Sequence, residues 1–411
     1  MRIKISVLVI SVIVAFYIIV GGLLPRYGVI ASNNDPYSQL TIFQEVLSRI
    51  VSDYVDEPDL EKVRLGALRG LAEGLDPYSA YLSPAQVKRM TSGVPAGEGE
   101  SGLIVSKVAG YLYVVSVIPG SPAATIGLSA GDVIEFVAGK ATRDLSLYEA
   151  KDLLVGPVGT EVELRAFRGG RSETFKLKLE ALRPRRPEGK VLEAGVGYLR
   201  LGSLEEGEAD LIKSELMALQ ARGVDRLILD VRGVATGKLS EAVRIANFFV
   251  GSGVLVKMVG REGRVRETIE ADPHQVIFRK PLIVLIDRST AGPAEVLAAA
   301  IGENKRGELV GERTFGIGGE QELFRLRDGG ALYITTVKYA SPTGRPIMGA
   351  TSATSGVQPT IEVRRPDRGM SPEELEEREE LPPSEQRLPR QPSAQAEDIQ
   401  LKRALEIIRS K

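Results

Sequence analysis

A chain of 411 residues is too long for one ordinary hydrophobic core and leaves room for about two or three domains. Hydrophobic residues make up 43% and charged residues 26%, a globular composition that excludes bulk disorder, collagen and a transporter with many membrane spans. The 53 Lys and Arg residues balance the 54 Asp and Glu residues, which disfavours nucleic acid as a partner, and the lack of Cys with a single His excludes disulfides, thiol chemistry and multi-histidine metal sites.

The N-terminal part of the chain contains a candidate membrane segment. Residues 5–24 form an uncharged, almost wholly apolar run of about the length that crosses the hydrocarbon core of a bilayer. Arg2 and Lys4 precede this run and favour a cytoplasmic N-terminus. A cleaved signal peptide is the alternative, but its apolar region is usually shorter. The sequence therefore predicts an anchor over 1–26 and a single-pass inner-membrane protein whose bulk is extracytoplasmic or periplasmic.

The next part of the chain predicts an N-terminal helical segment over residues 35–94. Apolar side chains recur at helical spacing between Leu40 and Leu75, and Asp76-Pro77 then interrupts the pattern, because a residue before proline is pushed out of the α region. Polar linkers rich in Gly and Pro, near 95–102 and 184–189, then bracket one small domain over 95–183.

Within this small domain, short strands alternate with turns and two capped helices. Ser121 precedes a proline at the first helical position, and Ser146 with Glu149 forms a capping box. The segments 121–140 (SPAATIGLSAGDVIEFVAGK) and 146–168 (SLYEAKDLLVGPVGTEVELRAFR) resemble a PDZ domain of the bacterial protease-associated type.

The PDZ resemblance implies a binding site for the C-terminus of a protein or peptide. Such a domain adds the peptide as a strand, and backbone N–H groups of a preceding loop hold the carboxylate. In this sequence the loop is Gly102-Leu103-Ile104-Val105, where Ile104 stands in place of a glycine that the family usually has. The alternative is a PDZ fold that packs on its neighbour and binds nothing.

The larger domain, over residues 190–365, is expected to contain a mostly parallel sheet. Apolar runs at 226–231 and 281–286 are each followed by a segment with helical spacing, at 239–249 and 293–301. Strands that are apolar on both faces are typical of βα units. Beyond this domain, residues 366–411 contain a stretch rich in Pro, Glu and Arg, which predicts a flexible tail with a short amphipathic helix at its end.

Several motifs occur together and in one order along the chain, namely LDPYSAYLSP (75–84), GYLRLGSL (197–204), LILDVRG (227–233), STAGPAEVLAAAI (289–301), GERTFGIG (311–318), GGALYITTVKYASPTGRPI (329–347) and GVQPTIEV (356–363). Through these motifs the chain resembles the carboxyl-terminal processing peptidases, the tail-specific serine proteases of family S41, from about residue 40 to 365. This resemblance implies an α/β fold with a crotonase-like (ClpP/crotonase) core and an inserted PDZ domain.

The resemblance also implies a Ser–Lys dyad, in which a serine at the start of a helix attacks the scissile carbonyl and a lysine takes its proton. The nucleophile's position falls on Gly292 and that of the lysine on Ile317. The following residue, which donates an oxyanion amide in the family, is Pro293 and has no N–H. The other oxyanion loop, residues 230–237, lacks an asparagine and a glycine of the family pattern. We therefore expect no intact catalytic residue.

Other polar residues near these motifs are weaker candidates for chemistry. Ser289 and Thr290 precede the helix and more simply bond local backbone, although a displaced nucleophile remains the alternative. His274 is expected to be a solvated loop residue, and Asp230 with Arg232 a structural ion pair. Lys305 and Lys338 stand in loop and strand contexts where exposure is expected.

The function that the sequence favours is that of a membrane-anchored pseudoprotease that binds protein C-termini or scaffolds partners. An active serine endopeptidase with a displaced nucleophile is the rival hypothesis, and a regulatory subunit that assembles with an active relative is a third. Homo- or hetero-oligomers are compatible with each of them. No cofactor, metal or nucleic acid is expected.

Overall fold

The computed structural model describes residues 36–92, 98–168, 171–183, 185–365, 369–380 and 397–411. In these ranges no helix is both long and apolar enough to cross a membrane. The single-pass inner-membrane location expected from the sequence is corrected on this finding, and the apolar run at 5–24 lies outside the described residues.

Internal contacts divide the chain into two units, residues 1–67 and 68–411. Helix α2 (Pro36–Asp53) lies in the first unit, and helix α3 (Leu60–Glu73) begins in the first unit and ends in the second. The Asp59 carboxylate caps the start of α3, because it accepts hydrogen bonds from the backbone N–H groups of Glu61 and Lys62 at 3.1 and 3.0 Å.

In the second unit, a tight turn follows α3 where proline interrupts the helical pattern. The Asp76 carboxylate accepts hydrogen bonds from the backbone N–H groups of Tyr78 and Ser79 at 2.8 and 2.9 Å. Strand β1 (Ala80–Leu82) and helix α4 (Pro84–Ser92) follow this turn.

The PDZ-like part of the second unit is built on a sheet with the strand order β3-β4-β5-β8-β9. Both predicted caps are present, since Ser121 Oγ accepts from Ala124 N and Ser146 forms a capping box with Glu149. Strand β3 ends the strand order, so its outer edge pairs with no strand of the described chain. The elements are β2 (Glu98–Glu100), β3 (Leu103–Val108), β4 (Tyr111–Val117), α5 (Pro122–Thr125), β5 (Val133–Val137), β6 (Lys140–Ala141), η1 (Thr142–Asp144), α6 (Leu147–Asp152), β7 (Val155–Pro157), β8 (Glu161–Arg168) and β9 (Arg171–Lys178).

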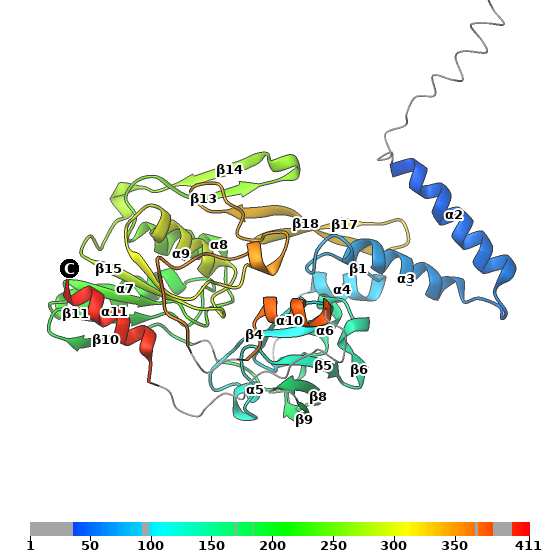
Figure 1. Cartoon of the computed structure of the whole chain (residues 1–411), viewed down its shortest axis with the longest axis horizontal. Coiled ribbons are helices and arrows are strands. Elements are labelled where there is room, and N and C mark those ends of the chain that lie inside the picture. Colours follow the sequence, from blue (N-terminus) through cyan, green and yellow to red (C-terminus); the bar gives the residue numbers. More distant parts are fainter. Residues whose placement is uncertain (1–35, 93–97, 169–170, 184, 366–368, 381–396) are drawn as a thin grey trace, which may run out of the picture. The chain divides into compact units, whose positions relative to one another are not determined.

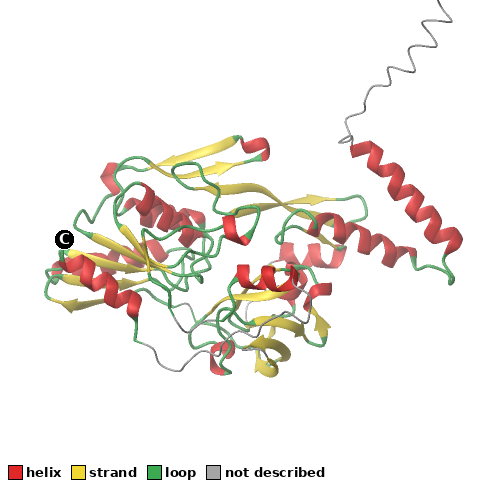
Figure 2. Ribbon diagram, in the orientation of Figure 1, coloured by secondary structure: helices red, strands yellow, loops and turns green. Residues whose placement is uncertain are grey.

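The larger part of the second unit contains a six-stranded sheet in the order β10-β11-β12-β15-β16-β19, which is parallel from β11 onward. Helices α7, α8 and α9 cover one face and helix α11 packs on the other (Figures 1 and 2). The elements are β10 (Glu188–Glu193), β11 (Val196–Arg200), α7 (Glu208–Ala221), β12 (Arg226–Asp230), α8 (Leu239–Asn247), β15 (Leu282–Ile286), α9 (Pro293–Glu303), β16 (Glu308–Gly311), β19 (Ile361–Glu362) and α11 (Ile399–Arg409).

A second sheet packs against α8 and α9 from the side opposite to the six-stranded sheet, so these helices lie between two sheets. Its strand order is β1-β18-β13-β14, with β17 paired to β18. Besides β1, this sheet contains β13 (Val254–Val259), β14 (Val265–Glu270), β17 (Gly319–Arg325) and β18 (Ala331–Ala340). Short 3₁₀ turns η2 (Arg261–Gly263), η3 (Pro273–Gln275) and η4 (Ser352–Thr354) occur in nearby loops.

The expectation of a flexible tail is wrong for residues 369–380. Helix α10 spans Pro372–Glu380, and Met370 and Leu375 are 7% and 2% exposed. A capping box starts this helix, because Ser371 N donates to Glu374 Oε2 at 2.6 Å and Glu374 N donates to Ser371 Oγ at 3.1 Å. Two buried apolar side chains and a good cap therefore order a segment whose charged composition suggested disorder.

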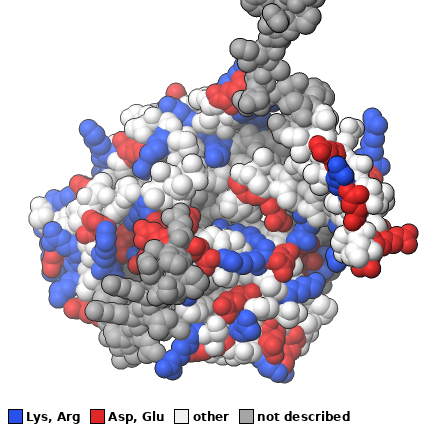
Figure 3. Space-filling view, turned by 45° about the vertical axis from the view of Figure 1, so that its right-hand side comes forward, with Lys and Arg blue, Asp and Glu red and all other residues white. Residues whose placement is uncertain are grey.

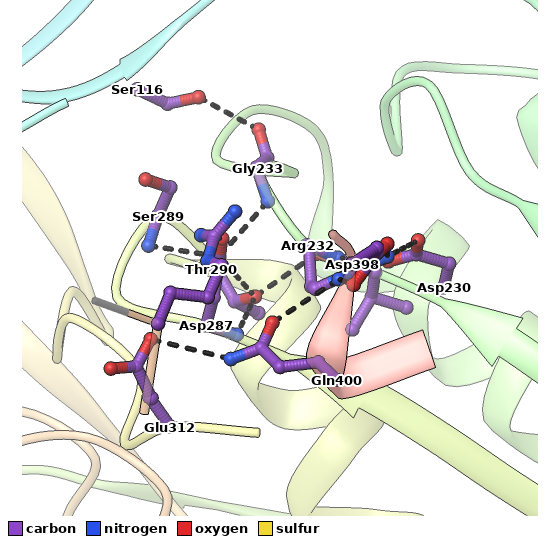
Figure 4. A network of polar contacts seen from close by, with 12 residues as sticks. Ser116, Asp230, Arg232, Gly233, Asp287, Ser289, Thr290, Glu312, Asp398 and Gln400 are labelled. Atoms are coloured by element: carbon purple, nitrogen blue, oxygen red, sulfur yellow. Dashed lines mark hydrogen bonds and ion pairs between the residues drawn. The ribbon is translucent and has the colours of Figure 1, made fainter. Parts of the chain in front are cut away.

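The C-terminal helix α11 is attached to the sheet by an ion-pair network that is buried at Asp230 and Arg232 and partly exposed at Asp398 (Figure 4). The Arg232 guanidinium, 8% exposed, donates two hydrogen bonds to Asp230 at 2.9 and 2.6 Å and two to Asp398 at 2.8 and 2.9 Å. Tyr198 donates its hydroxyl proton to Asp230 at 2.6 Å. Asp230 and Arg232 thus form the predicted structural ion pair, and Asp398 connects α11 to it.

We expect Asp398→Ala to weaken the docking of α11. Burial alone would raise the pKa of Asp398, but its hydrogen bonds and charge pairing with Arg232 hold the pKa below its ordinary value of 3.8. Because the folded-state pKa is lowered, this contribution is present above pH 4 and lost as the pH falls. The loss should be about 1–2 kcal/mol at pH 7, since Asp398 is partly exposed. Urea unfolding at pH 7 and pH 3 checks it, with the exposed Glu397→Ala as control.

Charged side chains of both signs are intermixed over the face shown in Figure 3. The described residues on that face form no large patch of one sign.

Candidate functional site

The position implied for the nucleophile lies at the start of α9, directly after the loop that follows strand β15. Gly292 is the N-cap with φ 63° and ψ −129°, a conformation that side-chain-bearing residues adopt only with strain. A Cβ atom built on Gly292 would find Ile317 O as its nearest neighbour, at 3.9 Å. The chain therefore keeps both a sharp turn and open space at this position. Pro293 occupies the first helical position and supplies no N–H.

The Glu295 side chain brings the two degenerate positions together. This carboxylate is fully buried and accepts hydrogen bonds from Gly292 N at 2.9 Å and from Gly316 N and Ile317 N at 2.7 Å. The Thr314 hydroxyl also donates to it. One carboxylate thus holds the start of α9 against the loop 314–317. The sequence analysis used Glu295 only to locate position 292, three residues before it. The residues around Glu295 in the sequence did not predict its hydrogen-bond partners.

Burial raises the pKa of Glu295 to about 8, while the bonds from Thr314 and the three backbone amides hold it lower than burial alone would. The Thr314 hydroxyl that donates to Glu295 itself accepts from Val357 N at 2.7 Å. The Glu295 side chain is therefore a fixed anchor for two loops. Its donors are three backbone amides and the Thr314 hydroxyl.

The loop expected to contribute the second oxyanion donor is held by contacts on both sides (Figure 4). Gly233 N donates to Asp287 Oδ1 at 3.1 Å, and Gly233 O accepts the Ser116 hydroxyl proton from strand β4 at 2.9 Å. Ala291 N donates to Val234 O at 2.9 Å. The N–H of Gly233 is therefore already engaged within the protein.

The hydroxyls of the two candidate replacement nucleophiles differ in their surroundings. Thr290 Oγ1 donates to Val231 O at 3.0 Å and accepts from Asp287 N at 3.1 Å, so it is bound to backbone as predicted. Ser289 is 7% exposed, and its N–H donates to Asp287 at 3.0 Å. The described residues place no Lys or His in hydrogen-bond contact with the Ser289 hydroxyl. His274 and Lys305 are exposed and Lys338 is half-buried.

The predicted carboxylate loop lies at the start of the edge strand β3. Gly102 has φ +79°, and a Cβ at this position would approach Ser121 Cβ to 2.1 Å, so only glycine fits. Leu103 and Val105 point into the core of the PDZ-like part, whereas Ile104 joins a different apolar cluster on the opposite face of the sheet. Gly102 thus precedes β3, and the side chains of Leu103, Ile104 and Val105 alternate between the two faces of the sheet.

No group of three or more potential metal-ligating His, Asp or Glu side chains occurs in the described ranges. The site is organised around one carboxylate, that of Glu295.

The fold and this site define a PDZ domain joined to a serine-peptidase core. The family profile "Peptidase family S41" matches residues 195–363, and the profile "PDZ domain" matches residues 113–166. The chain belongs to the carboxy-terminal processing proteases of family S41, which confirms the resemblance stated from the sequence.

Individual relatives give the same result. The Carboxy-terminal-processing protease of Bartonella bacilliformis is 31% identical over 345 residues, which cover 82% of this chain and 78% of that protein. The Carboxy-terminal processing protease CtpA of Bacillus subtilis is 29% identical, with 82% and 71% covered. Among solved structures, the photosystem II D1 C-terminal processing protease is 28% identical, with a TM-score of 0.66, and the match covers 82% of this chain and 94% of that one.

Proposed function

We propose that this chain is a catalytically degenerate member of its family, which binds protein C-termini through its PDZ domain and acts as a scaffold. The observation that carries the proposal is the convergence of positions 292 and 317 on Glu295, where neither residue brings a hydroxyl or an amine. Pro293 adds the loss of an amide donor. A protein that lacks the nucleophile, the base and part of the oxyanion site cannot catalyse peptide cleavage in this way. Binding is then the activity that remains.

The proposal includes the organisation inferred from the sequence. We take residues 35–94 as the N-terminal helical segment, 95–183 as the PDZ domain and 190–365 as a peptidase-like core of the crotonase type. The parallel sheet of the core, with helices on both of its faces, supports this division.

The free outer edge of β3 supports the proposed peptide groove. Strand addition needs an unpaired edge, and β3 ends its sheet within the described residues, with helix α6 packed beside it. The turn at Gly102 precedes this edge, and the Leu103 N–H donates to Ser101 Oγ at 3.2 Å. We propose that an extended peptide with an apolar C-terminus binds along β3.

Peptides with a free apolar C-terminus are expected to bind at least about tenfold more tightly than their amidated copies, because amidation removes the charge-assisted hydrogen bonds. Calorimetric titration of the purified protein with both forms checks this. Equal affinity for the two forms, or no binding at millimolar peptide, would leave the PDZ domain as a packing module only.

A glycine pair provides a matched control for the same titration. Gly102 and Gly120 both have φ +79°, but a Cβ at Gly120 meets no atom within 4 Å. Gly102→Ala and Gly120→Ala therefore impose similar backbone strain, and only the former collides with Ser121. We expect loss of peptide binding in Gly102→Ala and near-normal binding in Gly120→Ala.

The second candidate function is an active serine endopeptidase with a displaced nucleophile. The buried Ser289 hydroxyl favours it, since this group lies three residues before position 292. A general base within hydrogen-bond reach would be needed to activate it, and the Asp287 carboxylate is already engaged by Gly233, Ser289 and Thr290. A regulatory subunit that assembles with an active relative is compatible with the scaffold proposal.

A further inference from the structure

Two arginines come together where the linker that follows the PDZ domain crosses the end of strand β11. Arg185 lies in this linker, in the sequence Arg183-Pro184-Arg185-Arg186-Pro187, and Arg200 is the last residue of β11. Both side chains are half-buried. In the part of the chain that the structure describes, neither side chain makes a hydrogen bond or an ion pair, and the Nε atom of Arg200 is buried without an acceptor.

The alternation of side chains along β11 places Arg200 on the sheet face that packs on α11. Leu199 and Leu201 belong to the core on the side of helices α7, α8 and α9, whereas Tyr198 packs in the cluster on the α11 side. Successive side chains of a strand point to opposite faces of the sheet, so Arg200 points to the same side as Tyr198.

Gly202 brings the linker against this same face. A Cβ atom on Gly202 would lie 2.0 Å from Arg185 O and 2.9 Å from Arg185 Cβ, so no side chain fits between the two segments. Gly202 follows Arg200 by two residues, and its missing side chain would point to the face of Arg200. Arg185 therefore starts beside Arg200. Burial and the charge of Arg200 lower the pKa of Arg185, but an arginine side chain keeps its charge at neutral pH.

The neighbouring acidic side chains do not compensate these two positive charges by contact. Asp230 is the partner of Arg200 on strand β12, but its two oxygens already accept hydrogen bonds from Arg232 at 2.9 and 2.6 Å (Figure 4). Glu188 is the partner of Arg200 on strand β10; it is exposed and forms no ion pair with a described residue. Lys190, two residues further along β10, adds a third positive charge.

A phosphate group matches the donors and the charge at this place. The guanidinium of an arginine presents its N–H groups in a planar fork, and a single fork already engages both oxygens of a carboxylate. A phosphate group has at least three acceptor oxygens and a charge of about −1.5 to −2, so it can accept hydrogen bonds from two guanidinium groups at once.

We propose that Arg185 and Arg200 bind a phosphate group, either inorganic phosphate or a phosphomonoester, at the junction of the linker and strand β11. The oxygens of the bound group accept from both guanidinium groups, and the anion thereby bridges the linker to the sheet of the larger domain. The site contains neither position 292 nor position 317, so the inference does not depend on the proposed function.

Calorimetric titration of the full chain with inorganic phosphate and with glycerol 3-phosphate tests the site, with the ionic strength kept constant by chloride. We expect saturable binding of at least one of the two. The affinity should fall at least about tenfold in Arg185→Gln and in Arg200→Gln, because each substitution removes one donor fork and one positive charge. Arg200→Lys keeps the charge without the fork and should bind with intermediate affinity.

Arg222→Gln is the matched control, because Arg222 is exposed at the end of α7 and forms no ion pair with a described residue. It removes the same charge and should leave the affinity unchanged. If Arg200→Gln fails to fold, Arg185→Gln alone decides, since Arg185 lies outside the strands.

The outcomes of the titration are distinct. Binding that depends on Arg185 supports the proposal for either compound, and the compound that binds more tightly shows whether the group is free or esterified. No saturable binding of either compound at tens of millimolar would overturn the proposal. Unchanged affinity in Arg185→Gln, or an equal loss in Arg222→Gln, would overturn it as well, because the anion would then bind elsewhere or through general charge.

Discussion

The triple variant Gly292→Ser, Pro293→Ala, Ile317→Lys is expected to gain the serine chemistry that the unmodified chain lacks. Position 292 has room for a side chain, because a Cβ there meets only Ile317 O at 3.9 Å. The serine would be held in a strained conformation at a cost of about 1–3 kcal/mol. The introduced lysine would enter partly apolar surroundings, which lower the pKa of an amine and favour its role as a base. Fluorophosphonate labelling and cleavage of an unfolded substrate measure the gain.

The double variant Gly292→Ser, Ile317→Lys is the control for this experiment. Pro293 still leaves one oxyanion donor missing, which should lower the rate by about 10²–10³ relative to the triple variant. Equal activity of the double and triple variants would show that position 293 does not supply the donor. A triple variant that folds, takes no label and cleaves nothing would contradict our assignment of positions 292 and 317.

Removing the Glu295 carboxylate is expected to destabilise the protein strongly. Glu295→Ala leaves the N–H groups of Gly292, Gly316 and Ile317 without an acceptor in a buried site. Each unpaired buried group costs about 1–3 kcal/mol, so the loss for the three amides should be at least about 3 kcal/mol. Denaturant unfolding measures it. A loss below about 1 kcal/mol would mean that water or local rearrangement replaces the carboxylate.

The same residue predicts a pH dependence of stability. The pKa of Glu295 rises from an ordinary 4.5 to about 8 on folding, so between these values the folded state holds a proton that the unfolded state has lost. Stability should therefore fall as the pH rises through this window, by up to about 1.4 kcal/mol per pH unit. Glu295→Gln, which does not titrate, should remove this slope. An identical slope in the Gln variant would assign it to another group.

Much of the fold was predictable from local sequence patterns. Apolar runs followed by helical spacing predicted β12 with α8 and β15 with α9, because strands covered on both faces must be apolar throughout. The capping residues Ser121 and Ser146 were likewise readable, since a cap bonds amides only three residues away. The substitutions at 292, 293 and 317 were found by comparison with the family's motifs, and composition or periodicity alone would not have found them.

Contacts between distant segments were not predictable in the same way. Glu295 and the loop 314–317 are separated by about twenty residues, and nothing in either segment specifies that the Glu295 carboxylate accepts from two amides of that loop. The charged composition of α10 suggested disorder, although Ser371-Pro372-Glu373-Glu374 contains a capping box and a proline at the first helical position. Leu375 is buried only because the PDZ sheet presents an apolar outer face to it.

The most direct test of the account is an assay of the unmodified full chain against an unfolded substrate and a fluorophosphonate label. If the chain is catalytically degenerate, it should cleave no substrate and show no labelled serine. The triple variant serves as the positive control in the same assay. Clear proteolysis by the unmodified chain that Ser289→Ala or Thr290→Ala abolishes would contradict this account and establish a displaced nucleophile.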